Sequence, residues 1–172
     1  GLGVNPHHGL ADPWRMAYAA VDEAMRNVVA VGADPAKVAL MDNFSWGDPR
    51  RQTTLGDLVA AVEACCEAAD AFGAPFVSGK DSLNNEYLGA DGERHSVPPT
   101  LVITAVAHVP DADRVVTPDL AAPGNLLVHL GTVDAEFGGS HLDLVLADGA
   151  TGASTATPGV VPAPDPLAPA RY

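Results

Sequence analysis

Two stretches of helically spaced apolar residues, each followed by a short apolar run, constrain this fold most. The first stretch carries one stripe at alternating steps of four and three residues: Ala17, Val21, Ala24, Val28 and Val31. Asp12 and Pro13 are typical of an N-cap and a first helical residue, and Gly32 is typical of a C-terminal cap. We therefore expect a helix from Pro13 to Gly32 and a strand over 38–41.

The second stretch repeats this arrangement. Its stripe consists of Leu55, Leu58, Val62, Cys65, Ala69 and Phe72. The helix is expected to end at Gly73 and to be followed by a strand over 75–78. A hairpin tip at 90–92 and a long strand over 100–109 come next. Helix, strand, helix, strand and strand predict an α/β (α+β) fold with a mixed sheet.

The distribution of proline and glycine, 15 and 17 residues of 172, suggests three parts. Residues 1–121 form the main unit, and 122–146 open a second unit with a glycine-rich loop. Residues 147–172 hold five of the prolines and few large apolar residues, so a disordered tail is expected there. The absence of an initiator Met suggests a piece of a longer chain.

The charge balance excludes several partners. Nine Lys and Arg face 22 Asp and Glu, a formal charge of −13, which disfavours nucleic acids and anionic membranes. No apolar run approaches the roughly 20 residues of a membrane span, and no signal peptide opens the chain. Two adjacent cysteines, Cys65 and Cys66, suit a reducing compartment, so a cytoplasmic location is expected. A phosphorylated metabolite held through Mg²⁺ remains compatible.

One candidate metal site lies on the first helix. Glu23 and Asn27 are four residues apart, so their oxygens can converge on one point. A carboxylate and an amide oxygen are hard ligands of the kind Mg²⁺ takes. The small and apolar residues around them suggest a buried helix, although a solvated helix face is the open alternative.

Candidate ligand contacts follow both expected strands. Asp42 and Asn43 follow the first strand, where α/β proteins often bind ligands, but an Asx turn explains them equally well. After the second strand, Gly79 allows close backbone approach, Lys80 suits a phosphate, and Ser82 offers a hydroxyl. The loop lacks the first glycine and the Ser or Thr of a P-loop, so it is not one.

Three successive segments resemble the phosphoribosylformylglycinamidine synthase family: VDEAMRNVVAVGADPAKVALMDNFSWGDP, AFGAPFVSGKDSLNNEY and VPPTLVITAVAHVPD. The resemblance covers about residues 3–146 and is greatest to the second of the two homologous synthase halves. This family belongs to the aminoimidazole ribonucleotide synthetase superfamily. The resemblance implies that superfamily's N-terminal subdomain, followed by the start of its C-terminal subdomain. In that superfamily two such subdomains associate into a barrel.

The resemblance implies an ATP-dependent C–N ligase of de novo purine biosynthesis. In that reaction ATP phosphorylates the amide oxygen of formylglycinamide ribonucleotide, and ammonia displaces the phosphate to give the amidine. The ammonia comes from glutamine at a glutaminase domain or subunit, whose cysteine has no counterpart in this chain. The family's catalytic histidines lie in the other half. We therefore assign no catalytic residue here and expect the chain alone to be inactive.

The resemblance also implies roles for the candidate residues. Glu23 and Asn27 would hold Mg²⁺, Asp42, Asn43, Gly79 and Lys80 would contact ATP, and Ser82 would contact substrate. The short form of the family has a metal-binding Asn at position 80, so Lys80 is interpreted as a phosphate contact. The alternative is a non-catalytic half that holds a structural nucleotide. Its sheet is expected to bind the rest of the synthase or a second copy.

Overall fold

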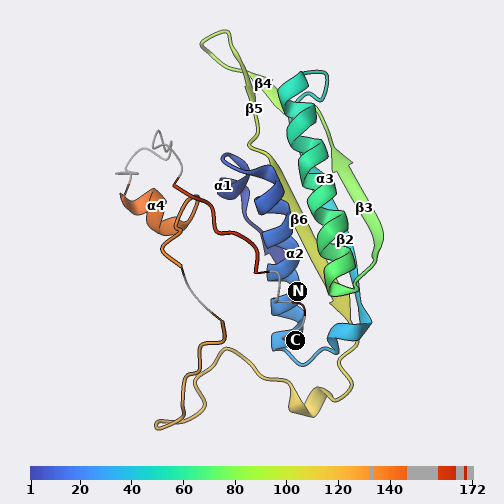
Figure 1. Ribbon diagram of the computed structural model, residues 1–172, viewed down its shortest axis with the longest axis vertical. Helices are drawn as coiled ribbons and strands as arrows, with labels where there is room; N and C mark the ends of the chain where they lie inside the picture. Colours follow the sequence, from blue (N-terminus) through green and yellow to red (C-terminus); the bar gives the residue numbers. More distant parts are fainter. Residues whose placement is uncertain (132–133, 147–158, 166–168, 170–172) are drawn as a thin grey trace.

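The computed structural model describes residues 1–131, 134–146, 159–165 and 169 (Figure 1). Its main sheet has the order β1-β6-β2-β3, with β1 at Leu2–Val4, β6 at Thr100–Ala107, β2 at Val38–Ser45 and β3 at Phe76–Ser82. β2 and β3 are parallel, whereas β6 is antiparallel to both β1 and β2. The predicted mixed sheet is therefore confirmed. The three-residue strand β1 was not anticipated.

Two long helices cover one face of this sheet (Figure 1). α2 spans Pro13–Ala30 and α3 spans Gln52–Phe72, and a one-turn helix, α1, covers Pro6–Gly9. The Asp12 side chain accepts a hydrogen bond from the Arg15 backbone N–H at 2.9 Å, as expected of an N-cap. Gly73 ends α3 in the left-handed conformation, at φ 63°. Both helices therefore agree with the sequence prediction.

The buried face of α3 differs from the predicted one. Its fully or nearly buried residues are Ala61, Ala64, Cys65 and Ala68. Leu55 and Val62, predicted to be buried, are 47% and 44% exposed. Small side chains allow α3 to lie close to the elements beneath it, which leaves the larger apolar residues outside. The core prediction for Leu55 and Val62 is therefore wrong.

Strands β2 and β3 both run further than the sequence suggests. Asp42 and Asn43 were expected at a turn, but they lie inside β2, hydrogen-bonded to β3 on one side and β6 on the other. The polar run 79–82, expected in a loop, belongs to β3. Pairing with neighbouring strands outweighs the low strand propensity of Asp, Asn and Gly here.

A bulge sets which side chains of β3 share a face with those of β2. Leu40 pairs with Phe76, whereas Met41 pairs with Ser78, so Val77 is an extra residue in β3. Beyond this point Asp42 is opposite Gly79. Paired residues project to the same side of a sheet, so the bulge determines the partner of Asp42.

The remaining elements are short: η1 at Pro35–Lys37, the hairpin of β4 at Glu86–Leu88 and β5 at Arg94–Ser96, η2 at Ala112–Arg114, and α4 at His141–Leu146. Residues 115–130, around the predicted start of a second unit, form no helix or strand. Of the predicted tail, 159–165 is described and is irregular. Its Val161 is buried, and the Val161 carbonyl accepts a hydrogen bond from the Arg15 guanidinium. The rest of the tail lies outside the described residues apart from 169.

No helix in the described part of the chain is long and apolar enough to cross a membrane.

Candidate functional site

Glu23 and Asn27 lie on the side of α2 that faces strand β1. The Glu23 Oε2 atom accepts hydrogen bonds from the Val4 backbone N–H at 2.8 Å and from the Asn5 side-chain amide at 3.0 Å. The Asn27 side-chain amide donates to the Leu2 carbonyl at 2.7 Å. The two side chains therefore hold strand β1 through its backbone. They come close to the same short strand, and the predicted convergence of their oxygens on one metal ion stays a prediction.

The surroundings of this pair differ from those expected. Asn27 is exposed and Glu23 is half-buried, so Glu23 is not a fully buried, unpaired carboxylate. Its hydrogen bonds to Val4 and Asn5 use Oε2, and the hydrogen bond of Asn27 uses the amide nitrogen, which leaves Glu23 Oε1 and Asn27 Oδ1 for another ligand. The ammonium of Lys80, considered as a competitor for Glu23, instead donates to the Ser82 hydroxyl.

Two oxygen donors suit Mg²⁺, which usually takes one or two protein ligands and keeps water and phosphate oxygens. Among the described residues, no group of three His, Cys, Asp or Glu side chains could hold a metal ion. The described residues can thus offer a metal site in which water and ligand oxygens supply most of the coordination. The donor set of Glu23 and Asn27 fits the predicted Mg²⁺.

Asp42 and Gly79 meet on the helix-covered side of the sheet. A Cβ atom on Gly79 would lie 2.0 Å from the Asp42 Oδ1 atom, so any other residue at this position would force the Asp42 carboxylate to move. Burial, followed by the nearby Asp81 carboxylate, raises the pKa of Asp42, and a hydrogen bond from the Lys80 backbone opposes the shift. The Asp42 carboxylate therefore lies in an environment that disfavours its own charge.

The other predicted contacts lie on the opposite face. Asn43 pairs with Lys80, and Ser45 pairs with Ser82, in the register that alternates with Asp42 and Gly79. The predicted nucleotide contacts are therefore divided between the two faces of the sheet. One ligand that touches all of them would have to reach around the exposed edge of β3.

The two sequence motifs are joined where β2 and β3 end. The Trp46 backbone N–H donates to the Ser82 carbonyl at 2.9 Å, and the Asn85 backbone N–H donates to the Trp46 carbonyl at 2.8 Å. The Asn85 amide also donates to the Ser45 hydroxyl at 3.1 Å. Asn84 adopts a positive φ of 72° in this turn. The two motifs are therefore joined by hydrogen bonds at the carboxyl ends of the strands.

Glu86 is a residue of this structure that the sequence analysis did not single out. Its side chain is 2% exposed and forms an ion pair of 2.8 Å with Arg51. It also accepts the Asp48 N–H at 3.1 Å. Because a buried carboxylate needs partners, Glu86 connects the hairpin to the start of α3. The sequence feature that could have identified Glu86 is its position near the end of the GKDSLNNEY motif.

The two cysteines are free and differ in environment. Cys65 is buried on α3, and its burial, then Asp42 and Cys66, raises the pKa of its thiol to about 12. A thiol with so high a pKa is a poor nucleophile. This agrees with assigning no catalytic role to Cys65.

A mixed sheet with two helices on one face and polar residues on its central strands defines the class as an α/β domain. Residues 1–109 match the family described as AIR synthase related protein, N-terminal domain. The chain belongs to this family, as its resemblance to the synthetase superfamily implied.

The more specific resemblance is also confirmed. The chain is 39% identical over 137 residues to phosphoribosylformylglycinamidine synthase subunit PurL of Thermomicrobium roseum, covering 80% of this chain and 18% of the relative. The same subunit of a Chelativorans species is 36% identical, covering 81% of this chain and 18% of the relative. The chain thus spans about a fifth of these relatives.

Solved structures agree with these relatives. Thermotoga maritima PurL in complex with AMPPCP superposes with a TM-score of 0.58 and 29% identity, covering 68% of this chain and 19% of the other. The same protein has been solved with ATP and with FGAR, and also as PurLQS.

Proposed function

We propose that this chain forms part of a phosphoribosylformylglycinamidine synthase. In the complete enzyme, formylglycinamide ribonucleotide and ammonia derived from glutamine by a glutaminase domain or subunit are joined at the expense of ATP. The likeness to PurL, whose solved complexes contain ATP or FGAR, supports this proposal. The two free cysteines fit a cytoplasmic enzyme.

Within this enzyme, Glu23 and Asn27 are the proposed ligands of Mg²⁺. The observation that carries this role is that each keeps one oxygen outside its hydrogen bonds to the N-terminal segment. Mg²⁺ would neutralise charge on the nucleotide phosphates, while the two side chains fix its position relative to α2. The proposed nucleotide contacts are Asp42, Asn43, Gly79 and Lys80, and the proposed substrate contact is Ser82.

A non-catalytic half that holds a structural nucleotide is the second candidate. The division of the proposed contacts between the two faces of the sheet bears equally on a productive and on a structural nucleotide, so turnover rather than binding distinguishes the two. In this case the same residues bind Mg²⁺ and nucleotide without taking part in turnover.

The substitution Glu23→Gln in the complete synthase tests the metal role. Glutamine keeps an acceptor for the Val4 N–H but loses the charge that attracts Mg²⁺. We expect Mg²⁺-dependent nucleotide binding, measured by calorimetry, to weaken more than tenfold, or about 1.4 kcal/mol. Binding without Mg²⁺ should change little.

Asp22→Asn is the matched control. Asp22 is the adjacent carboxylate on α2 and forms an ion pair with Arg26 at 2.8 Å. Its loss of charge should leave nucleotide binding within twofold of the unsubstituted enzyme. Equal affinities in the Glu23→Gln and unsubstituted enzymes would refute the metal role. Turnover that falls in parallel with binding identifies the productive site, and unchanged turnover identifies the structural one.

A further inference from the structure

Two serine hydroxyls lie side by side at the ends of β2 and β3, on the face of the sheet that α2 and α3 leave open (Figure 1). Ser45 of β2 pairs with Ser82 of β3, and paired residues project to the same side of a sheet. Neighbouring strands lie about 4.8 Å apart, so the two hydroxyls can reach the same ligand group. Ser82 is already a proposed substrate contact, whereas Ser45 has no role so far.

The Asn85 side chain determines the direction of the hydrogen bond at Ser45. Its amide nitrogen lies 3.1 Å from the Ser82 carbonyl oxygen and 3.1 Å from the Ser45 hydroxyl oxygen. A carbonyl oxygen can only accept, so the end of the amide that faces it is the NH2 group and not the oxygen. The same NH2 group must donate to Ser45, because it cannot accept. The Ser45 oxygen therefore accepts, and its own proton remains available for donation.

The ammonium group of Lys80 sets the same direction at Ser82. It donates to the Ser82 hydroxyl, and an ammonium group has no lone pair with which to accept. Neither the Ser45 nor the Ser82 hydroxyl donates to another residue that the structure describes. The ends of the two strands therefore present two available hydroxyl protons at paired positions. Such a pair suits a ligand group that bears acceptor oxygens.

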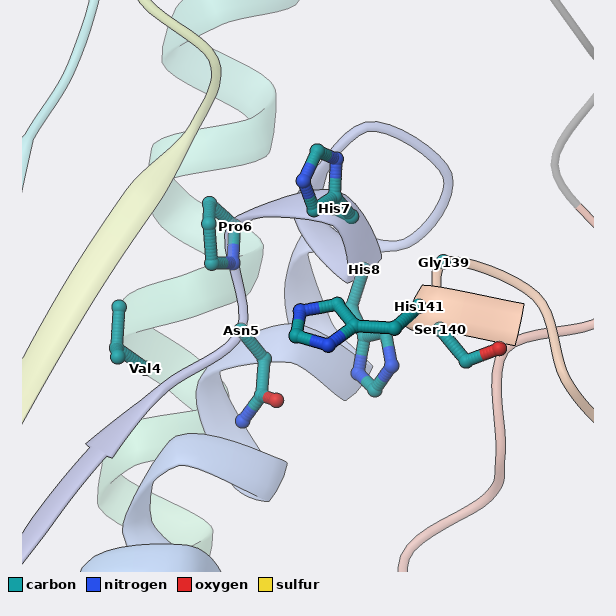
Figure 2. A pocket seen from close by; sticks show the side chains of 8 residues that line it. All are labelled: Val4, Asn5, Pro6, His7, His8, Gly139, Ser140 and His141. Atoms are coloured by element: carbon teal, nitrogen blue, oxygen red, sulfur yellow. The ribbon is translucent and has the colours of Figure 1, made fainter. Parts of the chain in front are cut away.

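The hydroxyl of Thr100 provides a contrast on the same face. Thr100 of β6 pairs with Ser45 on the other side of β2, but its hydroxyl donates to the Pro98 carbonyl at 2.9 Å. The Thr100 proton is therefore already used within the chain. The pocket between the N-terminal segment and the start of α4, which Figure 2 shows, is lined by none of these three hydroxyl residues. The pair of available hydroxyls is thus a feature of the sheet surface and not of that pocket.

The two serine protons need acceptors once this face is covered. The sheet is expected to bind the rest of the synthase, which would exclude water from the open face. A buried hydroxyl without a partner is unfavourable. Ser82 is proposed to contact substrate, so the acceptor oxygens of that substrate lie within reach of its neighbour Ser45.

We infer that Ser45 is a second substrate-contacting residue, which donates its hydroxyl proton to the same oxygen-bearing group as Ser82. Asn85 donates to the Ser45 oxygen and so leaves this proton for the ligand. The inference rests on the proposed function, in which Ser82 contacts formylglycinamide ribonucleotide. It adds a specificity-determining residue from the other strand of the pair.

Steady-state kinetics of the complete synthase, with ammonium as the nitrogen donor, test this role. Ser45→Ala should lower kcat/KM for formylglycinamide ribonucleotide about fivefold, the loss expected for one hydrogen bond, while the KM for ATP stays within twofold. Ser45→Thr keeps a hydroxyl and suits a strand, so its kcat/KM should stay within twofold of the unsubstituted enzyme. Thr100→Val is the matched control and should also stay within twofold, because the Thr100 proton is already used.

The double variant Ser45→Ala, Ser82→Ala tests whether the two hydroxyls hold one group. Its loss in kcat/KM should then differ more than twofold from the product of the two single losses. A loss equal to that product, or an equal loss in Ser45→Ala and Ser45→Thr, overturns the inference. An unchanged kcat/KM in Ser45→Ala shows that another acceptor takes the proton and also overturns it, while the proposed function stands if Ser82→Ala lowers kcat/KM. An unsubstituted enzyme that forms no amidine refutes the proposed function, and this inference with it.

Discussion

Adjacent residues on β2 face different surroundings, and Asp42 is the clearest case. Its carboxylate lies on the side covered by helices, close to Cys65 and Asp81, whereas Asn43 projects to the other face. Sequence reasoning identified both residues as polar and next to a strand. It could not separate them, because strand pairing with β6 and β3 determines which side each one takes.

The raised pKa of Asp42 leads to a pH-dependent prediction. With a folded pKa above the unfolded value of about 3.9, the folded chain binds more protons in that interval, so its stability falls as pH rises through it. Asp42→Asn removes this loss of stability, because asparagine cannot ionise. Urea unfolding should show the variant to be more stable than the unsubstituted chain at pH 7, with the difference shrinking below pH 4. A constant difference across this range would contradict the argument.

The contact between Gly79 and Asp42 leads to a second prediction. Gly79→Ala forces a Cβ atom against the carboxylate, and overpacking of this kind costs about 1–3 kcal/mol. Urea unfolding should show this loss, and adding Asp42→Ala should recover most of it. Gly56→Ala on α3 is the control, because nothing lies within 4 Å of its Cβ and the change should stabilise the helix.

At the scale of elements, helix positions were predictable and strand lengths were not. Asp12, Pro13 and Gly73 mark helix ends by local hydrogen bonding and backbone conformation, which a sequence carries directly. The extent of β3 to Ser82 depends on pairing with β2, which no local pattern reveals. The prediction of the buried face of α3 was wrong for Leu55 and Val62. The apolar residues of α3 form two possible helical stripes, and close packing buries the stripe that is rich in alanine.

Strand β1 depends on its contacts with α2. Asn27→Ala removes the hydrogen bond to the Leu2 carbonyl, which should lower local stability by about 1 kcal/mol. Hydrogen exchange of the Gly3 and Val4 amides should therefore accelerate several-fold. Arg26→Ala, the neighbouring exposed position paired with Asp22, should leave these amides unchanged. Equal exchange in both variants would show that Asn27 does not hold the strand.

At the scale of the molecule, the sheet has one face covered by helices and one left open in Figure 1. Apolar side chains on the open face include Leu2, 51% exposed, and Val106, also 51% exposed. Exposed apolar surface of this kind is typical of an interface. The resemblance to the superfamily, whose barrel is built from two such subdomains, predicted an apolar face of this kind, and the partner of this face stays a prediction.

We expect this face to bind the rest of the synthase in the complete enzyme and to mediate self-association of the isolated chain. Val106→Lys introduces a charge on the open face and should shift the chain from dimer to monomer in light scattering at high concentration. Val59→Lys on the outer side of α3 is a matched control, because Val59 is 49% exposed and lies outside the sheet. A monomeric unsubstituted chain that binds no apolar dye would count against this interface.

The bulge at Val77 sets the register between β3 and β2. Deleting Val77 would restore regular pairing while leaving Gly79 beside Asp42, because the residues after it keep their partners. Deleting Ser78 instead gives a chain of the same length, in which Val77 takes the place opposite Met41 and Gly79 still lies beside Asp42. The two deletions differ only in whether serine or valine occupies that paired position. The contact between Gly79 and Asp42 therefore depends on the pairing after the bulge and not on which of the two residues is extra.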